Sequence, residues 1–268
     1  MNALVPQWAA VGKVVIGMIH LRALPGSPRF DGNLQGVRES ALRDADALTQ
    51  GGVQGLMIEN FGDTPFFPGR VPAHVVAAMT AIASEVKLRT PLPLGINVLR
   101  NDGQGALAVA HAVGARFIRV NVLCGARVTD QGLLQGIAHE LLRDRAILAA
   151  TDVRIFADVD VKHSAPLAKR PIDEEVSDML ERGMADALIV SGAGTGKPTD
   201  AQQLGVVQRA ARPAPVFVGS GVTVQSLDDI APHADGFIVG TALKRDGRAE
   251  NPVDVARVRE LMEAVRRL

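Results

Sequence analysis

Short apolar runs alternate with longer amphipathic stretches along the whole chain, and this alternation most limits the folds open to it. The runs are rich in Val, Ile and Leu, as is typical of parallel strands that are buried on both faces. The expected strands are Lys13–Ile19, Val53–Glu59, Leu92–Asn97, Arg116–Asn121, Arg154–Val159, Ala185–Ser191, Pro215–Val218 and Asp235–Val239.

The stretches between these runs fit the helical period better than strict alternation. The expected helices are Leu34–Gln50, Ala73–Leu88, Gly103–Val113, Leu133–Ala149, Ile172–Arg182, Asp200–Ala211, Val224–Ile230 and Val253–Leu268. Their ends carry boundary signals: Gly51–Gly52, Gly114 and Gly183 as stops, Thr199 or Asp200 as a cap, and Asn251–Pro252 as a start.

Eight strand–helix units in 268 residues predict a closed (β/α)8 TIM barrel that occupies residues 1–268 as one domain. An open, doubly wound α/β sheet is the structural alternative. No linker, low-complexity segment or block of charge divides the chain.

The composition limits the classes of binding partner and the cellular location that we expect. Lys plus Arg equals Asp plus Glu, 29 each, which gives no reason to expect nucleic acid as a partner. The single cysteine, Cys124, excludes an intrachain disulfide and fits a cytoplasmic location. The N-terminus lacks the pattern of a signal peptide, and no apolar run has the length of a transmembrane helix, so any association with a membrane is expected to be peripheral.

Polar or glycine residues end almost every expected strand. In barrels of this class the active site lies over the carboxyl ends of the strands, so these residues are expected to surround one site. In chain order they are His20, Glu59 with Asn60, Asn97, Asn121, Asp158 with Asp160, Ser191, Gly219–Gly221 and Gly240–Thr241.

Two glycine turns, in VFVGSGVT and FIVGTAL, follow the last two expected strands. Phosphate binds where backbone N–H groups converge without obstruction by Cβ atoms, and barrel phosphate sites recur at this position. We therefore expect a phosphorylated ligand. Gly219, Gly221 and Gly240 would supply amides, and Ser220 and Thr241 would add hydroxyls. The structural alternative is that these glycines only form tight turns.

The segment SGAGTGKPTD resembles a P-loop but lacks its defining residues. Ser191 stands where the first glycine belongs, and Pro198 follows Lys197 where a magnesium ligand is required. Hydrolysis of a nucleotide by that mechanism is therefore excluded. The loop remains rich in glycine, so Gly192 and Gly194 are further candidate phosphate contacts, and Lys197 is placed to meet an anion.

Alternating charged residues follow the fifth expected strand. If the strand continues, Asp158, Asp160 and Lys162 point to one side. Together with Glu59 they are candidates for general acid–base groups, for a Schiff-base lysine held by carboxylates, or for part of a divalent-metal site. A structural ion cluster is the alternative. Neighbouring carboxylates are expected to raise the pKa of Lys162, which argues against the Schiff base.

The remaining polar strand ends are candidate substrate contacts: Asn97, Arg119, Asn121 and Ser191. Arg119 is expected inside the barrel and must then be paired, with Glu59 or Asp158 as partner. His20 is either an acid–base group or a structural histidine. No nucleophile signature surrounds Cys124.

Four of the eight phenylalanines fall in the first two expected strand-to-helix loops: Phe30, Phe61, Phe66 and Phe67. They cover either the ligand or a second subunit, and subunit packing in a homo-oligomer is the favoured expectation.

A run of motifs across almost the whole chain resembles the BtpA/SgcQ family: GMIHLRALPGSP, GLMIENFGDTPF, GINVLRND, RFIRVNVLCGARVTDQG, ADVDVKHS, IVSGAGTGKPTD and VGSGVT. The resemblance implies a barrel of the ribulose-phosphate-binding class. Cyanobacterial members of that family are associated with photosystem I as peripheral membrane proteins. Members from organisms without a photosystem imply an enzyme of sugar or nucleoside metabolism. The resemblance carries over no catalytic residues.

Two functions are thus expected from different classes. The first is an aldolase, isomerase or lyase that acts on a phosphorylated sugar or nucleoside-like metabolite, with a divalent metal left open as a cofactor. The second is a non-catalytic factor for the assembly or stability of a membrane complex such as photosystem I.

Overall fold

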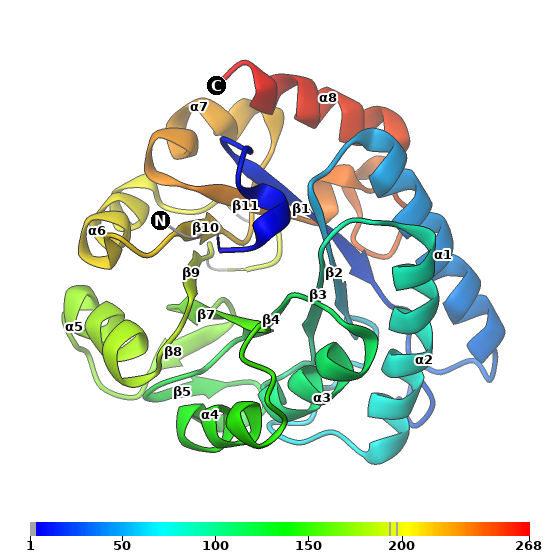
Figure 1. The fold of residues 1–268 in the computed structure, drawn as a ribbon, viewed down its shortest axis with the longest axis horizontal. Coiled ribbons are helices and arrows are strands. Elements are labelled where there is room, and N and C mark those ends of the chain that lie inside the picture. Colours follow the sequence, from blue (N-terminus) through cyan, green and yellow to red (C-terminus); the bar gives the residue numbers. More distant parts are fainter. Residues whose placement is uncertain (1–3, 193, 197) are drawn as a thin grey trace.

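A computed structural model describes residues 4–192, 194–196 and 198–268. Over these residues, eight parallel strands close into a barrel, with helices around the outside (Figure 1). The order around the barrel is β1 (Val14–His20), β2 (Gly55–Glu59), β3 (Leu94–Asn97), β4 (Phe117–Val120), β7 (Arg154–Val159), β9 (Ala187–Val190), β10 (Val216–Val218) and β11 (Gly236–Val239). This confirms the TIM-barrel prediction.

The barrel closes because β1 pairs with both β2 and β11. The surrounding α-helices are α1 (Leu34–Gly51), α2 (Ala73–Arg89), α3 (Gly103–Val113), α4 (Ala138–Ile147), α5 (Ile172–Ser177), α6 (Ala201–Ala211), α7 (Leu227–Ile230) and α8 (Val255–Arg266). A π-helical turn, Asp178–Arg182, extends α5 to Gly183.

Helix α1 shows how the sequence fixes these elements. The side chain of Asn33 accepts a hydrogen bond from the amide of Gly36 at the N-terminus of the helix. Buried residues at helical spacing, among them Ala41, Ala45 and Leu48, face the barrel. Gly52, with φ 93°, ends the helix in a left-handed conformation that favours glycine.

Aromatic side chains fill the inside of the barrel. Phe117, Phe156 and Phe217 are buried there, and the rings of Phe117 and Phe156 stack at 4.7 Å. Trp8, from the short 3-10 helix Pro6–Trp8, lies 5.6 Å from Phe117 between ring centroids, and its Nε1 donates to the carbonyl of Gln54. Gln54 directly precedes β2, so Trp8 covers the N-terminal end of the barrel.

The expected helix Leu133–Ala149 is wrong in its first turn. Gly132–Gln135 is instead strand β6, which pairs antiparallel with β5 (Ala126–Thr129) and so joins β8 (Ser164–Pro166) in a small sheet. Leu133 is 49% exposed and Leu134 is buried, which is the alternation of a strand.

The start of the last helix also differs from the expectation. Asp254 caps α8 by accepting from the amide of Ala256, whereas Asn251 and Pro252 precede the helix. Val253 forms a bridge with Lys244, and its amide donates to Asp44. The buried Asp44 therefore holds residue 253 in an extended conformation.

Among the described residues, no helix is both long enough and apolar enough to cross a membrane.

Candidate functional site

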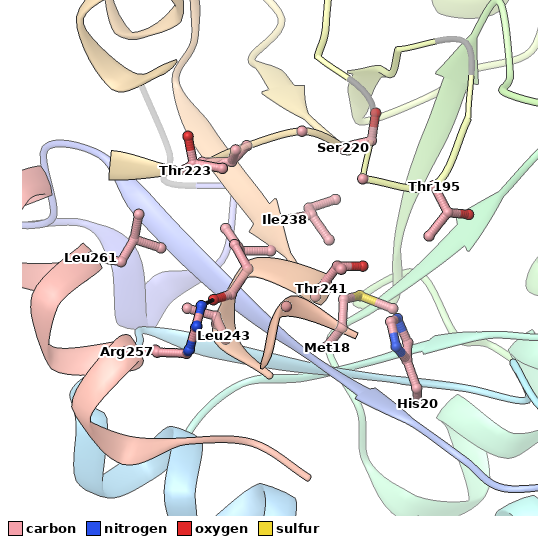
Figure 2. Close-up of a pocket in the computed structure, with 18 of the residues that line it drawn as sticks. Met18, His20, Thr195, Ser220, Thr223, Ile238, Thr241, Leu243, Arg257 and Leu261 are labelled. Carbon is pink, nitrogen blue, oxygen red and sulfur yellow. Dashed lines mark hydrogen bonds between the residues drawn. The ribbon is translucent and has the colours of Figure 1, made fainter. Parts of the chain in front are cut away.

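A cavity of about 370 Å³ opens at the carboxyl ends of the strands (Figure 2). Its walls come from the ends of β1, β2 and β4, from the loops after β7, β9, β10 and β11, and from α8. The predicted site residues that line it are His20, Glu59, Arg119, Lys162, Gly219, Ser220, Gly221, Gly240 and Thr241.

A second group of predicted residues lies behind this lining. Asp158 accepts from Arg119 Nε at 3.0 Å and Nη2 at 2.8 Å, and from Asn121 Nδ2 at 2.6 Å. Arg119 Nη2 also lies 3.5 Å from the hydroxyl of Ser191. The Arg119–Asp158 pair is fully buried, so Asp158, Asn121 and Ser191 hold Arg119 in place at the floor of the cavity.

Glu59 is buried and ionised at the edge of the cavity. Asn97 Nδ2 donates to Glu59 Oε2 at 2.6 Å. Burial raises the pKa of the Glu59 carboxyl, but the positive charges of Lys162 and Arg119 and the Asn97 hydrogen bond outweigh it, and the pKa lies below its usual value. Glu59 can therefore accept a proton at neutral pH, and Asn97 positions it.

His20 faces Glu59 across 4.0 Å, between Nε2 and Oε1. Its Nδ1 lies 3.4 Å from the carbonyl oxygen of Ala249, and its ring stacks on Phe61 at 4.5 Å. Burial lowers the pKa of His20 to about 4. The imidazole is then neutral at pH 7. In the tautomer whose Nδ1–H donates to the carbonyl oxygen of Ala249, the lone pair of the imidazole is on Nε2.

The lowered pKa of His20 predicts a loss of stability in mild acid. The unfolded chain binds a proton near pH 6.5, whereas the folded chain binds it only near pH 4. The free energy of unfolding should therefore fall by up to about 3 kcal/mol as the pH drops through this window. Urea denaturation between pH 7 and pH 4 measures the slope. The slope should flatten in His20→Gln and persist in His139→Gln, because His139 is exposed.

Lys162 behaves differently from the expectation. It is half-buried, and burial, followed by the charge of Arg119, lowers its pKa despite Glu59 and Asp158. The predicted rise in its pKa is therefore wrong, because burial and the charge of Arg119 outweigh the effect of the two carboxylates.

Asp160 does not join this group. Strand β7 ends at Val159, and Asp160 has φ 54°, so the expected alternation stops there. Its carboxylate accepts from Arg127 Nη1 at 2.6 Å and from Gln203 Nε2 at 3.1 Å. Asp160 thus belongs to an ion cluster on the small sheet.

Both glycine turns line the cavity. Gly240 lies against His20, since a Cβ atom at Gly240 would come within 2.8 Å of the imidazole, and Thr241 is beside His20 in Figure 2, whereas Ser220 lies farther from it. The amide of Gly219 is used within the barrel, where it donates to the carbonyl of Val190 at 2.8 Å. Among the described residues, no acceptor is recorded for the amides of Gly221 and Val222. These two amides, rather than that of Gly219, are available to an anion.

The loop after β9 contributes Thr195 and Gly196 to the lining. The amide of Gly192 donates to the hydroxyl of Ser220 at 2.7 Å, so it braces the glycine turn. The structure places neither Gly192 nor Gly194 on the cavity wall. The predicted anion contact of Lys197 lies outside the described residues.

Sequence reasoning missed the contributions of α8 and of the loop after β3. Arg257 and Leu261 enter the cavity from α8, across Thr241 from His20 (Figure 2). Buried Arg100 donates from Nη2 to the carbonyl of Lys162 at 2.5 Å and so supports the lysine backbone. None of these follows directly on a strand, so the rule that identified the other residues did not reach them.

Within the described part of the chain, no group of three or more His, Cys, Asp or Glu side chains could hold a metal ion. Burial raises the pKa of the Cys124 thiol, which disfavours the reactive thiolate.

Comparison with known proteins places this barrel among relatives of similar length. The model of the BtpA family matches residues 11–267. The Photosystem I biogenesis protein BtpA of Synechocystis is 48% identical over 251 residues, 94% of this chain and 87% of that protein. An uncharacterized protein of Thermococcus kodakarensis is 46% identical over 256 residues, 96% of each chain. The structure of N-(5'-phosphoribosyl)anthranilate isomerase from Pyrococcus furiosus has a TM-score of 0.58 at 11% identity, over 96% of this chain and 100% of that one.

Proposed function

This chain belongs to the BtpA family, and we propose that it is an enzyme that acts on a phosphorylated sugar or nucleoside-like metabolite. The observation that carries the proposal is a single cavity with two chemically different ends. One end presents the free amides of Gly221 and Val222, and the other presents Glu59, His20 and Lys162.

The glycine end suits a phosphate group. Backbone amides that converge without side chains bind phosphate oxygens, and barrels of this class use the turns after the seventh and eighth strands for this purpose. Gly221 has φ 68°, a conformation that favours glycine and directs successive amides to one side. Thr241 adds a hydroxyl, and Arg257 on α8 adds a positive charge to the same wall.

The other end suits proton transfer on a small carbon skeleton. Glu59 is an ionised acceptor, and neutral His20 has its lone pair on Nε2, 4.0 Å from the carboxylate. Arg119 is fixed by Asp158 and can stabilise negative charge that develops on a substrate oxygen. Aldolase, isomerase and lyase reactions all need this combination of a base and a charge-stabilising group.

A charge placed at Thr241 tests the phosphate end. Ligand at one hundred times its Kd should stabilise the wild-type protein by about 2.7 kcal/mol. Thermal shift with ribose 5-phosphate and with inorganic phosphate should show this gain, and ribose should not. Thr241→Asp should abolish the gain through repulsion of the anion.

The matched control is Thr151→Asp, which adds the same charge at an exposed position outside the cavity lining. It should keep the full stabilisation by ribose 5-phosphate. An equal loss in both variants, or no response of the wild type to any phosphate compound, would count against an enzyme of this kind.

The second candidate is a non-catalytic factor that stabilises a membrane complex from its surface. The name of the Synechocystis relative favours it, and Phe67, 49% exposed in the loop after β2, offers an apolar contact. Co-sedimentation with liposomes of anionic lipid distinguishes the two, since only the factor requires membrane binding.

Homo-oligomerisation through the same aromatic loops and a cytoplasmic location are further parts of this proposal. Phe67 is exposed, whereas Phe61 is engaged by His20. Light scattering of the purified protein and of Phe67→Ser measures the first, and cell fractionation measures the second.

A further inference from the structure

Within the described residues, the amine of Lys162 makes no hydrogen bond and no ion pair, although the side chain is half-buried and lines the cavity. Buried lysines are almost always paired, because an isolated ammonium is costly to remove from water. The chain holds the backbone of Lys162 firmly, since Arg100 donates to its carbonyl at 2.5 Å. An unpaired amine on a fixed backbone, aimed into a site, calls for a ligand.

Three other described lysines are either paired or exposed to water. Lys13 donates to the carbonyls of Ala231 and Ala234. Lys244 is fully buried and pairs with Asp44. Lys169 is exposed to water. Lys87 on α2 is, like Lys162, half-buried without an ion pair, but it lies outside the cavity. Lys162 differs from the other described lysines because its unpaired side chain lines the cavity.

The carboxylates near Lys162 are already engaged by other groups. Both oxygens of Asp158 are occupied by Arg119, and one also by Asn121. Glu59 is held by Asn97 and faces His20. The amine therefore lies near charged side chains without forming a hydrogen bond or ion pair to any of them. The positive charge of Arg119 opposes its protonation.

We propose that Lys162 is a nucleophile that forms an imine with the aldehyde or ketone carbon of a phosphorylated substrate held at Gly221 and Val222. The proposal rests on the function proposed above and names its substrate class: a phosphorylated carbonyl compound. Lysines that are desolvated or lie beside another cation are activated for this reaction, and both conditions apply to Lys162.

The step balances with groups in the cavity. Glu59 or His20 takes a proton from the ammonium, and the freed lone pair of Nζ attacks the carbonyl carbon. A C–N bond forms, and the oxygen takes up a proton. The nitrogen then loses its second proton, and the C–O bond breaks as that oxygen receives another proton and leaves as water. The two protons that leave nitrogen equal the two that the oxygen gains, so no proton is taken up overall, and the cationic imine carries the charge that the ammonium had. Ionised Glu59 offsets that charge.

Reductive trapping tests the imine. The full-length protein is incubated with glyceraldehyde 3-phosphate and cyanoborohydride, which delivers hydride to an imine carbon and fixes the adduct as a secondary amine. Peptide mass spectrometry then gives the extent of modification at each lysine. Lys162 should exceed exposed Lys169 by at least about tenfold, because a bound probe is held beside the amine.

Two variants and one competitor accompany the trapping. Lys162→Met should lose the adduct at this position, and Lys162→Arg should lose it too while it keeps the positive charge. Excess inorganic phosphate should lower modification of Lys162 and leave Lys169 unchanged. The comparison of Lys162 with Lys169 and the competition by phosphate both use the wild-type protein, so they remain valid even if a variant fails to fold.

The outcomes separate this inference from the function that it deepens. If glyceraldehyde without phosphate modifies Lys162 equally well, the imine is supported and the phosphate end is overturned. If glyceraldehyde 3-phosphate stabilises the protein but modifies Lys162 no more than Lys169, the imine is overturned. The phosphate end then stands, and Lys162 serves as a cation that anchors a second anionic group.

Discussion

Replacement of Asp158 by alanine is expected to lower the free energy of unfolding by about 3–5 kcal/mol, because it leaves a buried guanidinium without its counter-charge. Arg119 is 2% exposed, and Asp158 supplies both oxygens that neutralise it. Arg119 meets only the cavity, and the side chain of Asp158 is fully buried, so among the described residues no other counter-charge replaces the lost carboxylate. Urea denaturation at pH 7 measures the loss as a shift of the midpoint.

Asp152→Ala is the matched control. Asp152 also pairs with an arginine, Arg116, at 3.0 Å, but both side chains are largely exposed. Exposed pairs contribute about 0–1 kcal/mol, so this variant should be close to wild type. A similar, small loss in both variants would show that Arg119 finds other partners at the floor of the cavity.

A second large loss, again about 3–5 kcal/mol, is expected for Asp44→Ala. Asp44 lies on α1 and pairs with Lys244, which follows the loop after β11, and both side chains are buried. Its other oxygen accepts from the amide of Val253 at 2.8 Å. The variant would leave both a cation and a backbone donor unsatisfied in the interior.

This pair also fixes the segment after Gly240 that closes the phosphate end. Asp44→Ala should therefore weaken stabilisation by ribose 5-phosphate along with the fold, whereas Asp158→Ala should not act on that end. The control is Asp46→Ala on the same helix, whose pair with Arg89 is exposed. Unchanged stability in Asp44→Ala would contradict the assignment of Lys244 as a buried, charged partner.

The barrel can be predicted from the sequence because strands that are covered on both faces must be apolar along their length. The runs around Ile16, Ile58 and Ile189 show this, and each lies in a barrel strand. A fixed fold then places the strand ends at one face, which is why the sequence predicts that His20 and Glu59 lie close together, as they do.

The limits of the prediction have physical causes. Asp160 was expected beside Asp158, but one left-handed residue redirected it to Arg127, and local backbone conformation of that kind has no pattern in the sequence. The lowered pKa of Lys162 arises from burial and from the charge of Arg119, and only three-dimensional contacts define both. Arg257 lies in the first turn of α8 and is exposed, so the sequence does not distinguish it from other surface arginines.

Trp8 covers the end of the barrel opposite the cavity, and it is the only tryptophan in a chain without tyrosine. Its indole is therefore an intrinsic optical probe of whether the barrel is closed, isolated from the ligand by the layer of Phe117 and Phe156. The fluorescence emission of Trp8, excited at the red edge of protein absorption, should therefore change when the barrel unfolds. Titration of the folded protein with anions should leave this emission unchanged.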